Sequence, residues 1–423
     1  MSEPAIVRDV LPNGLRVLTE RMPHVRSVSI GVWLTRGSRH ESAAQSGIAH
    51  FVEHMLFKGT ATRSAEEIAQ TVDSIGGQMD AFTAKEYAGY YLKVLDEHLP
   101  LAIDVLADIV MNPAFRDDDI EREKKVVLEE IKMVEDTPDD LVHELFTERF
   151  WAGHPLGRPI LGQPETVEAL TADVLRQYFS GVYTAPNLIV AAVGNIEHDR
   201  VRDLVARAFD ALPRLSIVAA ETPPDVVPGV TIRHKDLEQS HVCLGTSGYR
   251  QDHADRYASY ALNTVLGGSM SSRLFQNVRE KRGLAYAVFS GLSAYRDTGT
   301  MTVYAGCAND AVSELIDVVV AELRKIKDEP LGDAELQRAK DHLKGSLMLN
   351  LESTSSRMSH IARQEIYFDT QQGLDETLEG VGKVTQEDVQ RVARDLFADG
   401  QLAATVVGAV DGLTIPAERL SLG

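Results

Sequence analysis

The chain has 423 residues, of which 44% are hydrophobic and 25% are charged, as expected for a globular protein of two or three domains. Its 43 lysines and arginines against 63 aspartates and glutamates give a formal net charge of −20. This charge argues against a nucleic-acid-binding protein, whose contact surface has to be strongly positive.

Cysteine usage and hydropathy narrow the class of protein further. The two cysteines, Cys243 and Cys307, lie in apolar, strand-like runs, so we expect small core residues and not a disulfide framework. No apolar run reaches the roughly 18 residues of a membrane-spanning helix. The first residues lack the basic and apolar regions of a signal peptide, so we predict a cytoplasmic protein.

The first half of the chain predicts strands followed by helices. An Asn-Gly turn precedes a strand at 15–18, and residues 28–34 alternate in part with period two. The other elements expected in this half are a helix near 46–57, a helix that begins at Ser64, strands within 78–94, long helices near 96–111 and 117–136, and a strand near 183–194.

A proline-rich segment divides the chain into two similar halves. Four prolines fall between Leu212 and Gly229 without helical periodicity, which is typical of a linker. Short motifs in the first half recur about 210 residues later, each in the same local context. We therefore predict homologous domains at 1–212 and 230–423, joined by a linker at 213–229. Strands cluster before helices in each half, so the expected fold is α+β, with a mostly antiparallel sheet flanked by helices in each domain.

The strongest chemical signal is His50-Phe51-Val52-Glu53-His54. On a helix, His50, Glu53 and His54 lie on one face, while the neighbouring residues are apolar and predict burial. Three ionisable groups on a buried helix need compensation, which a divalent metal supplies. Two imidazoles at this spacing suit zinc, and the carboxylate between them is placed to act as general base. The alternative is a chance match that contains two core histidines.

Helical periodicity selects a third zinc ligand from the acidic helix at 120–136. One face of this helix is fully charged, whereas Glu130 and Glu123 lie on the opposite, mainly apolar face. Glu130 is therefore the predicted ligand, because a catalytic zinc takes three protein ligands and leaves one position for water. Glu123, two turns earlier, is placed either to orient a ligand or to pair with a core arginine or lysine.

These motifs together resemble the pitrilysin family of inverted-motif zinc peptidases, and within it the subfamily that contains the mitochondrial processing peptidase and its bacterial relatives. The family places its third ligand 76 residues after the second histidine, which is the step from His54 to Glu130. The likeness covers essentially the whole chain. The other segments that carry it are Gly37-Ser38-Arg39, Phe57-Lys58-Gly59-Thr60, Ile75-Gly76-Gly77, Ala81-Phe82-Thr83, Glu129-Glu130-Ile131, His154-Pro155-Leu156-Gly157, Tyr183–Asn187 and Gly194-Asn195.

The resemblance implies a role for the second half of the chain. Family enzymes use an arginine and a tyrosine seven residues apart, which match Arg279 and Tyr286. Tyr286 would donate a hydrogen bond to the oxyanion, and Arg279 would hold the substrate. On sequence alone, a core tyrosine and a surface cation are the simpler interpretations. The family also implies a clam-shaped chamber, and a homodimer is the simplest assembly because one chain carries both sets of residues.

The predicted substrate is an extended peptide. Relatives add substrate as a strand to the hairpin that corresponds to 78–94, which implicates Asp80, Ala81 and Phe82, although many relatives have asparagine at the position of Asp80. Processing peptidases carry acids at the offsets of Asp140 and Glu144, so a preference for basic peptides is a hypothesis. An acidic surface without specificity is the alternative.

The sequence thus predicts a zinc endopeptidase with one Zn²⁺ per chain, since no ligand set occurs at the equivalent positions of the second half. Peptide substrates are expected, and neither nucleic acid nor membrane is an expected partner. The alternatives are a non-catalytic assembly subunit and a peptidase of the same family that serves one cofactor-maturation pathway.

Overall fold

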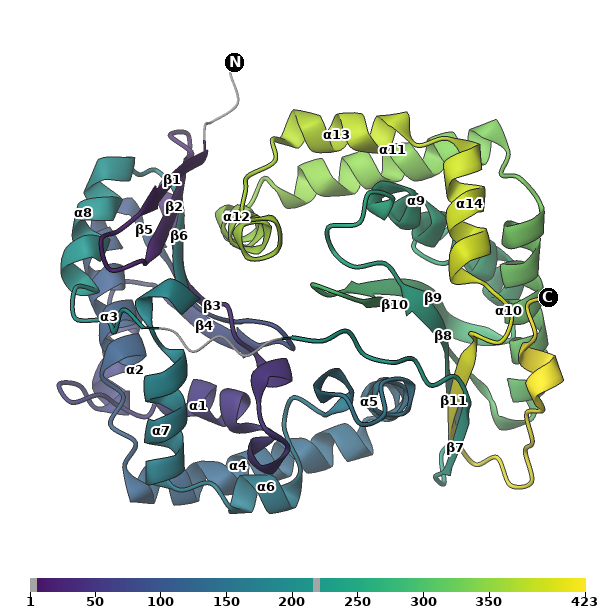
Figure 1. Ribbon diagram of the computed structural model, residues 1–423, viewed down its shortest axis with the longest axis horizontal. Coiled ribbons are helices and arrows are strands. Elements are labelled where there is room, and N and C mark those ends of the chain that lie inside the picture. The colour runs from purple at the N-terminus through teal and green to yellow at the C-terminus, as the bar shows by residue number, and fades with distance from the viewer. Residues whose placement is uncertain (1–5, 216–220) are drawn as a thin grey trace. The chain divides into compact units, whose positions relative to one another are not determined.

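The computed structural model describes residues 6–215 and 221–423 and divides them between two compact units. Unit 1 comprises residues up to 132, 158–221 and 350–371, and unit 2 comprises 133–157, 222–349 and 372–423. Each unit contains one sheet with helices on its faces (Figure 1). Part of the predicted linker at 213–229, residues 216–220, lies outside the described residues.

Apart from the additional edge strand β1 in unit 1, the two sheets share one topology, which fits the duplication expected from the sequence. In unit 1 the strand order is β1-β2-β6-β3-β5-β4, and in unit 2 it is β7-β11-β8-β10-β9. One parallel pair occurs in each sheet, β2 with β6 and β7 with β11, and all other pairs are antiparallel. The strands span Ile6–Val10 (β1), Arg16–Arg21 (β2), Ser27–Leu34 (β3), Gln78–Thr83 (β4), Ala88–Leu95 (β5), Leu188–Gly194 (β6), Val230–His234 (β7), Gln239–Gly248 (β8), Ala285–Ala294 (β9), Gly299–Ala308 (β10) and Ala403–Gly408 (β11).

Helices cover both faces of each sheet. In the first half of the chain they span Ile48–Leu56 (α1), Ala65–Asp73 (α2), Leu99–Met111 (α3), Asp117–Asp136 (α4), Pro138–Phe150 (α5), Pro164–Glu168 (α6), Ala172–Val182 (α7) and His198–Ala208 (α8). In the second half they span Arg256–Leu266 (α9), Val312–Asp328 (α10), Asp333–Asn350 (α11), Thr354–Phe368 (α12), Leu374–Lys383 (α13) and Gln386–Leu396 (α14). Within the described residues, no helix is both long and apolar enough to cross a membrane.

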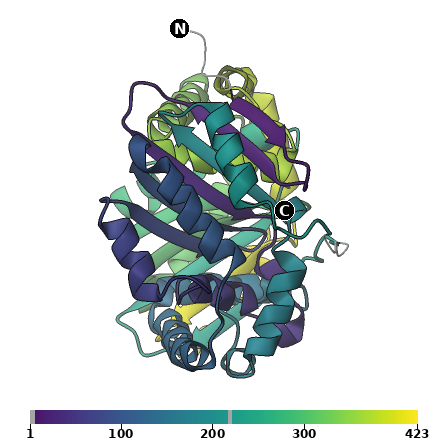
Figure 2. The same ribbon diagram turned by 90° about the vertical axis from the view of Figure 1, so that its left-hand side faces the viewer.

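The central strands of unit 1 are apolar on both faces. In β6, Leu188, Val190 and Ala192 join the core beneath α3 and α8, which Figure 2 shows in front of the sheet. The alternate residues Ile189 and Ala191 join a second core on the other face. This pattern is the one expected for a strand that is buried on both sides.

The second face of each sheet is covered by a helix from the other half of the chain. Helix α12 packs against β6 and β3 of unit 1, whereas α5 packs against β11 and β8 of unit 2. The predicted continuous domains, 1–212 and 230–423, therefore differ from the compact units. Periodicity indicates that a helix has an apolar face, but it does not identify the sheet on which that face packs.

Both polar and apolar contacts hold α12 on the sheet of unit 1. The Ser29 hydroxyl lies 2.8 Å from the Thr354 hydroxyl and 2.9 Å from that of Ser355. The fully buried carboxylate of Glu365 accepts hydrogen bonds from Arg8 and Arg16. The buried groups among them, Ser29, Thr354 and Glu365, all have partners, so they fix the position of the helix without an unpaired charge.

We expect Met358→Ala to test the contribution of α12 to unit 1. Met358 is fully buried between α12 and the sheet, so truncation should lower the free energy of unfolding by about 2–5 kcal/mol. Amide hydrogen exchange in β6 should accelerate in the same variant. Arg363→Ala, an exposed position on the same helix, is the control and should change stability by no more than about 0.5 kcal/mol. Equal effects of the two substitutions would contradict the packing role of α12.

Candidate metal centre

Helix α1 presents three ionisable side chains from an otherwise buried helix. Ile48, Ala49, Phe51, Val52, Met55 and Leu56 are all buried, and most of them contribute to the main core of unit 1. His50, Glu53 and His54 occupy the remaining face at the predicted i, i+3, i+4 spacing and are partly buried. The apolar residues thus fix the helix, and its fixed position determines where the three polar groups lie.

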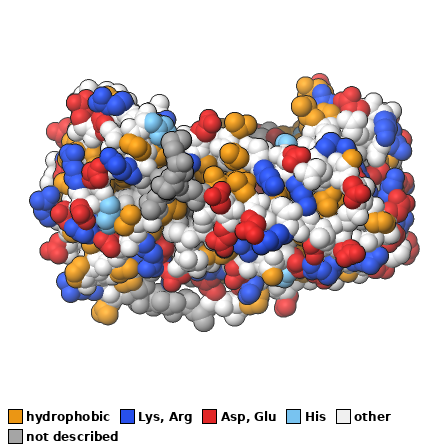
Figure 3. Space-filling model, turned by 90° about the horizontal axis from the view of Figure 1, so that it is seen from above, with side chains coloured by type: hydrophobic (Ala, Val, Ile, Leu, Met, Phe, Trp, Pro, Cys, Tyr) orange, Lys and Arg blue, Asp and Glu red, His pale blue; other side chains and the backbone are white. Residues whose placement is uncertain are grey.

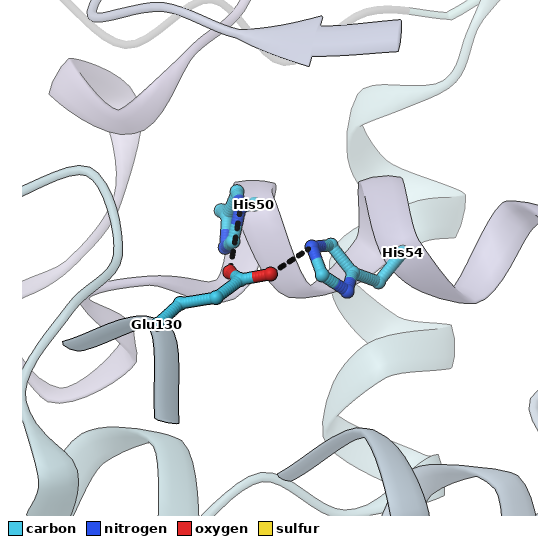
Figure 4. A group of neighbouring side chains, drawn as sticks. All are labelled: His50, His54 and Glu130. Atoms are coloured by element: carbon cyan, nitrogen blue, oxygen red, sulfur yellow. Dashed lines mark ion pairs between the residues drawn. The ribbon is translucent and has the colours of Figure 1, made fainter. Parts of the chain in front are cut away.

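Helix α4 brings Glu130 to the two histidines (Figure 4). The Nε2 atoms of His50 and His54 each lie 3.6 Å from a different carboxylate oxygen of Glu130. One ligand atom from each of the three residues lies within 4.8 Å of the others. Tetrahedral zinc with bonds of 2.0–2.2 Å separates its ligand atoms by roughly 3.4 Å, which is close to the two separations of 3.6 Å.

The hydrogen bonding and the protonation state of His50 are also those expected of a metal ligand. Its Nδ1 atom is buried and has no hydrogen-bond partner among the described residues, whereas Nε2 faces Glu130. Burial, with a smaller effect of the neighbouring His54, lowers the pKa of His50 to about 4. The imidazole is therefore neutral near pH 7, which is the form that binds a metal.

Glu123 contacts both kinds of partner that the sequence left open, a histidine of the candidate site and a lysine. Its Oε2 atom lies 3.1 Å from Nδ1 of His54, and its Oε1 atom lies 2.7 Å from Nζ of Lys58. A buried carboxylate at Nδ1 holds the His54 ring with Nε2 directed at Glu130. Lys58 was not expected from the sequence, although it follows His54 by four residues and so lies one turn further along.

Glu53, the predicted general base, is held from the sheet. Its Oε2 atom accepts a hydrogen bond of 2.5 Å from the hydroxyl of Thr83, the last residue of β4. Burial raises the pKa of Glu53, and the hydrogen bond from Thr83 opposes that rise. This contact was not expected from the sequence, because it joins a helix to a strand 30 residues later.

Glu41 satisfies the N-terminus of α1, and this residue too was not expected from the sequence. Its two carboxylate oxygens accept hydrogen bonds from the backbone N–H groups of Gly47 and Ala49, at 2.9 and 2.8 Å. An N-terminal helix turn has unpaired N–H groups, so a buried carboxylate from outside the helix replaces the usual cap. Burial nevertheless outweighs these bonds and raises the pKa of Glu41 to about 7.

β4 is one of the two edge strands of the unit 1 sheet, and its side chains alternate between the two faces. Ala81 packs on the core side that also carries α1. Phe82 packs on the opposite side, against Trp33 and Tyr87. Asp80 is exposed and accepts hydrogen bonds from the Tyr91 hydroxyl and from the backbone of Ala81. The structure thus brings Ala81 to the side of the candidate metal centre, and Phe82 to the other side.

The remaining predicted residues belong to unit 2. Arg279 lies in a short π-helix, Phe275–Glu280, with its guanidinium carbon 4.8 Å from the centre of the Phe275 ring and 4.3 Å from that of Tyr286. Tyr286 is 78% exposed, so it is not the core tyrosine of the simpler interpretation. Asp140 and Glu144 lie on α5. The participation of these four residues in a site with the histidines of unit 1 stays a prediction.

We expect Glu41→Gln to change how stability depends on pH. The folded-state pKa of about 7 exceeds the ordinary 4.5, so protonated Glu41 contributes stability that is present below about pH 4.5 and is lost as the pH rises through about 7. Between pH 5.5 and 8, the wild type should lose about 2 kcal/mol relative to Glu41→Gln. Urea unfolding of both metal-free proteins at the two pH values measures this change. A constant difference would mean that the two N–H bonds keep Glu41 ionised throughout.

We expect Glu123→Gln to weaken zinc binding about 10- to 100-fold, because the amide removes the charge that orients His54. The measurement is competition with a chelator of known zinc affinity. Glu129→Gln is the matched control, since Glu129 is on the same helix, is exposed and forms a surface ion pair with Lys132. Equal zinc affinity of Glu123→Gln and the wild type would argue against the orienting role.

Comparison with known proteins gives two family matches in succession. Residues 16–164 match the family described as insulinase (peptidase family M16), and residues 169–343 match the peptidase M16 inactive domain. A protein named "Uncharacterized zinc protease YmxG" from Bacillus subtilis is 44% identical over 95% of this chain and 98% of its own length. "Uncharacterized zinc protease Rv2782c" from Mycobacterium tuberculosis is 42% identical over 95% of this chain and 92% of its own.

Solved structures of similar proteins have the same fold. The crystal structure of a protease from Helicobacter pylori superposes with a TM-score of 0.89 at 27% identity, covering 96% of this chain and 99% of that one. A peptidase M16 inactive domain from Pseudomonas fluorescens has a TM-score of 0.91 at 21% identity, covering 97% and 100%, and supports the fold alone. The α+β fold of two related domains and the resemblance to the pitrilysin family are therefore confirmed. The chain belongs to the M16 (insulinase) family of peptidases.

Proposed function

We propose that the protein is a zinc-dependent endopeptidase that holds one zinc ion through His50, His54 and Glu130. The observation that carries the proposal is the convergence of these three side chains within 4.8 Å on a helix whose other residues are buried. The names of the relatives, which describe them as zinc proteases, support the choice of metal. None of the three ligand positions has been lost, as would be usual in a non-catalytic relative.

The proposed chemistry divides between the metal and the side chains. Bound zinc supplies a Lewis acid that lowers the pKa of water and polarises the scissile carbonyl. Glu53 accepts the proton of the attacking water and delivers it to the leaving amine. Glu53 suits this role because it lies on the same helix face as the two histidines and because burial raises its pKa above the ordinary value.

The proposed substrate is a peptide in extended conformation, added as a strand to β4. An edge strand has backbone N–H and C=O groups that pair with no other strand, and such groups bind an extended chain. β4 also ends at Thr83, whose hydroxyl contacts Glu53. The exposure of Tyr286 and the stacking of Arg279 against it support a role for this pair in substrate binding.

We further propose a preference for basic peptides and assembly as a homodimer. Acidic and basic side chains are interspersed on the face seen in Figure 3, so the preference would depend on local acids such as Asp140 and Glu144 and not on one uniformly acidic surface. A homodimer is the simplest assembly because each chain carries the zinc-binding residues and the Arg279–Tyr286 pair. Light scattering of the purified protein tests the mass of the assembly.

The central test combines metal content with hydrolysis of quenched peptides by the wild type, Glu53→Gln and Glu130→Gln. We expect one zinc per wild-type chain, retained zinc but at least about 100-fold slower turnover in Glu53→Gln, and zinc loss in Glu130→Gln. Glu129→Gln should retain both properties. Two peptides that differ only by arginine or glutamine near the cleaved bond test the preference for basic substrates.

The possible outcomes separate the competing functions. Zinc with no turnover of any peptide by the wild type would favour an assembly subunit or a dedicated maturation peptidase. Absence of zinc from the wild type would contradict the metal site itself. Equal cleavage of the arginine and glutamine peptides would remove the basic preference and leave the peptidase proposal intact.

A further inference from the structure

The short contact between the edge strand and the base extends the proposed function. Thr83 is the last residue of β4, and its hydroxyl donates a hydrogen bond of 2.5 Å to Oε2 of Glu53. Ala81 and Met79, two and four residues earlier, pack against the core on the α1 side. Thr83 continues this alternation, so its hydroxyl reaches Glu53 from the strand itself.

A glutamate base needs such a restraint. Its carboxylate turns about several single bonds, whereas proton transfer requires one oxygen at hydrogen-bond distance from the reacting water. The hydrogen bond from Thr83 holds Oε2. Among the described residues, Oε1 has no recorded hydrogen-bond partner. Holding one oxygen reduces the orientations that the other can take, which lowers the entropic cost of reaching the reactive geometry.

Unit 2 contains a similar contact between a strand hydroxyl and a helix, and this contact suggests a purely structural role as the alternative explanation. There the Ser290 hydroxyl on the edge strand β9 donates a hydrogen bond of 2.7 Å to Oδ1 of Asn263 on α9. The same strand-to-helix contact therefore occurs where the acceptor is an amide, which cannot act as a base. A contact that only joins strand to helix would be structural in both units.

We propose that Thr83 is a positioning residue for Glu53, and that it links the strand on which the substrate binds to the orientation of the base. This inference rests on the proposed function. The hydroxyl of Thr83 donates its hydrogen bond to Glu53, so we expect its loss to reduce kcat and leave KM nearly unchanged. A substrate strand that pairs with β4 would hold Thr83, and through it Glu53, in the reactive arrangement.

The test compares Thr83→Val, which removes the hydroxyl at nearly constant volume, with Thr83→Ser, which keeps it. We expect Thr83→Val to lower kcat about 10- to 100-fold, with KM within about twofold of the wild type and with zinc content and Tm retained. Thr83→Ser should recover most of the lost kcat. Ser290→Ala, which removes the counterpart in unit 2, should leave kcat at the wild-type value.

Three results would overturn the inference: wild-type kcat in Thr83→Val, an equal loss in Thr83→Ser, or a loss of kcat that accompanies loss of zinc. Crystal structures of the zinc-loaded wild type and Thr83→Val give a readout that needs no turnover. The Glu53 carboxylate should have one orientation in the wild type and several in the variant, and one unchanged orientation in both would contradict the proposal. A wild type that binds zinc but cleaves nothing would instead count against the peptidase function, while these structures still decide the role of Thr83.

Discussion

Two imidazoles and a carboxylate converge beside a buried helix, and this concentration of polar groups constrains the structure around it. Burying such groups costs free energy unless each finds a partner. Here Glu130 faces both histidines, while Glu123 pairs with His54 on one side and with Lys58 on the other. The requirement for compensation thus extends outward from α1 to α4 and to the residues that follow α1.

The same requirement explains which parts of the site the sequence predicts. The position of Glu130 on the mainly apolar face of α4 follows from the sequence, because the apolar and charged faces of a helix alternate with a period of 3.6 residues. The spacing within α1 follows for the same reason. Thr83 and Glu41 could not be predicted, because their partners lie in other elements and each residue type is common in a purely structural role. For Glu123, periodicity indicated the face of the helix on which it lies. The sequence left two alternatives, a zinc ligand or a basic residue as its partner, and the structure has both, His54 and Lys58.

As with the site, some features of the fold could be predicted from the sequence and others could not. The clustering of strands before helices indicated an α+β fold of two related halves, and both sheets have the expected mainly antiparallel pairing. The duplication also left equivalent contacts, since an edge-strand hydroxyl meets an α-helix in both units while only unit 1 offers a carboxylate. The exchange of α5 and α12 was not predictable, because an apolar helix face carries no information about a partner sheet far along the chain.

This exchange has a consequence for the order in which the protein is synthesised. A nascent chain that has been completed to β6 already contains every strand of the unit 1 sheet, with apolar residues such as Ile189 and Ala191 on the face that α12 will cover. That helix is made about 160 residues later, so the face stays without its final cover while the larger part of unit 2 is synthesised. Domains usually fold one after another as they leave the ribosome, but here unit 1 reaches its native packing only when the chain is almost complete. An uncovered apolar sheet face of this kind makes the partly synthesised chain prone to aggregation until α12 has been made.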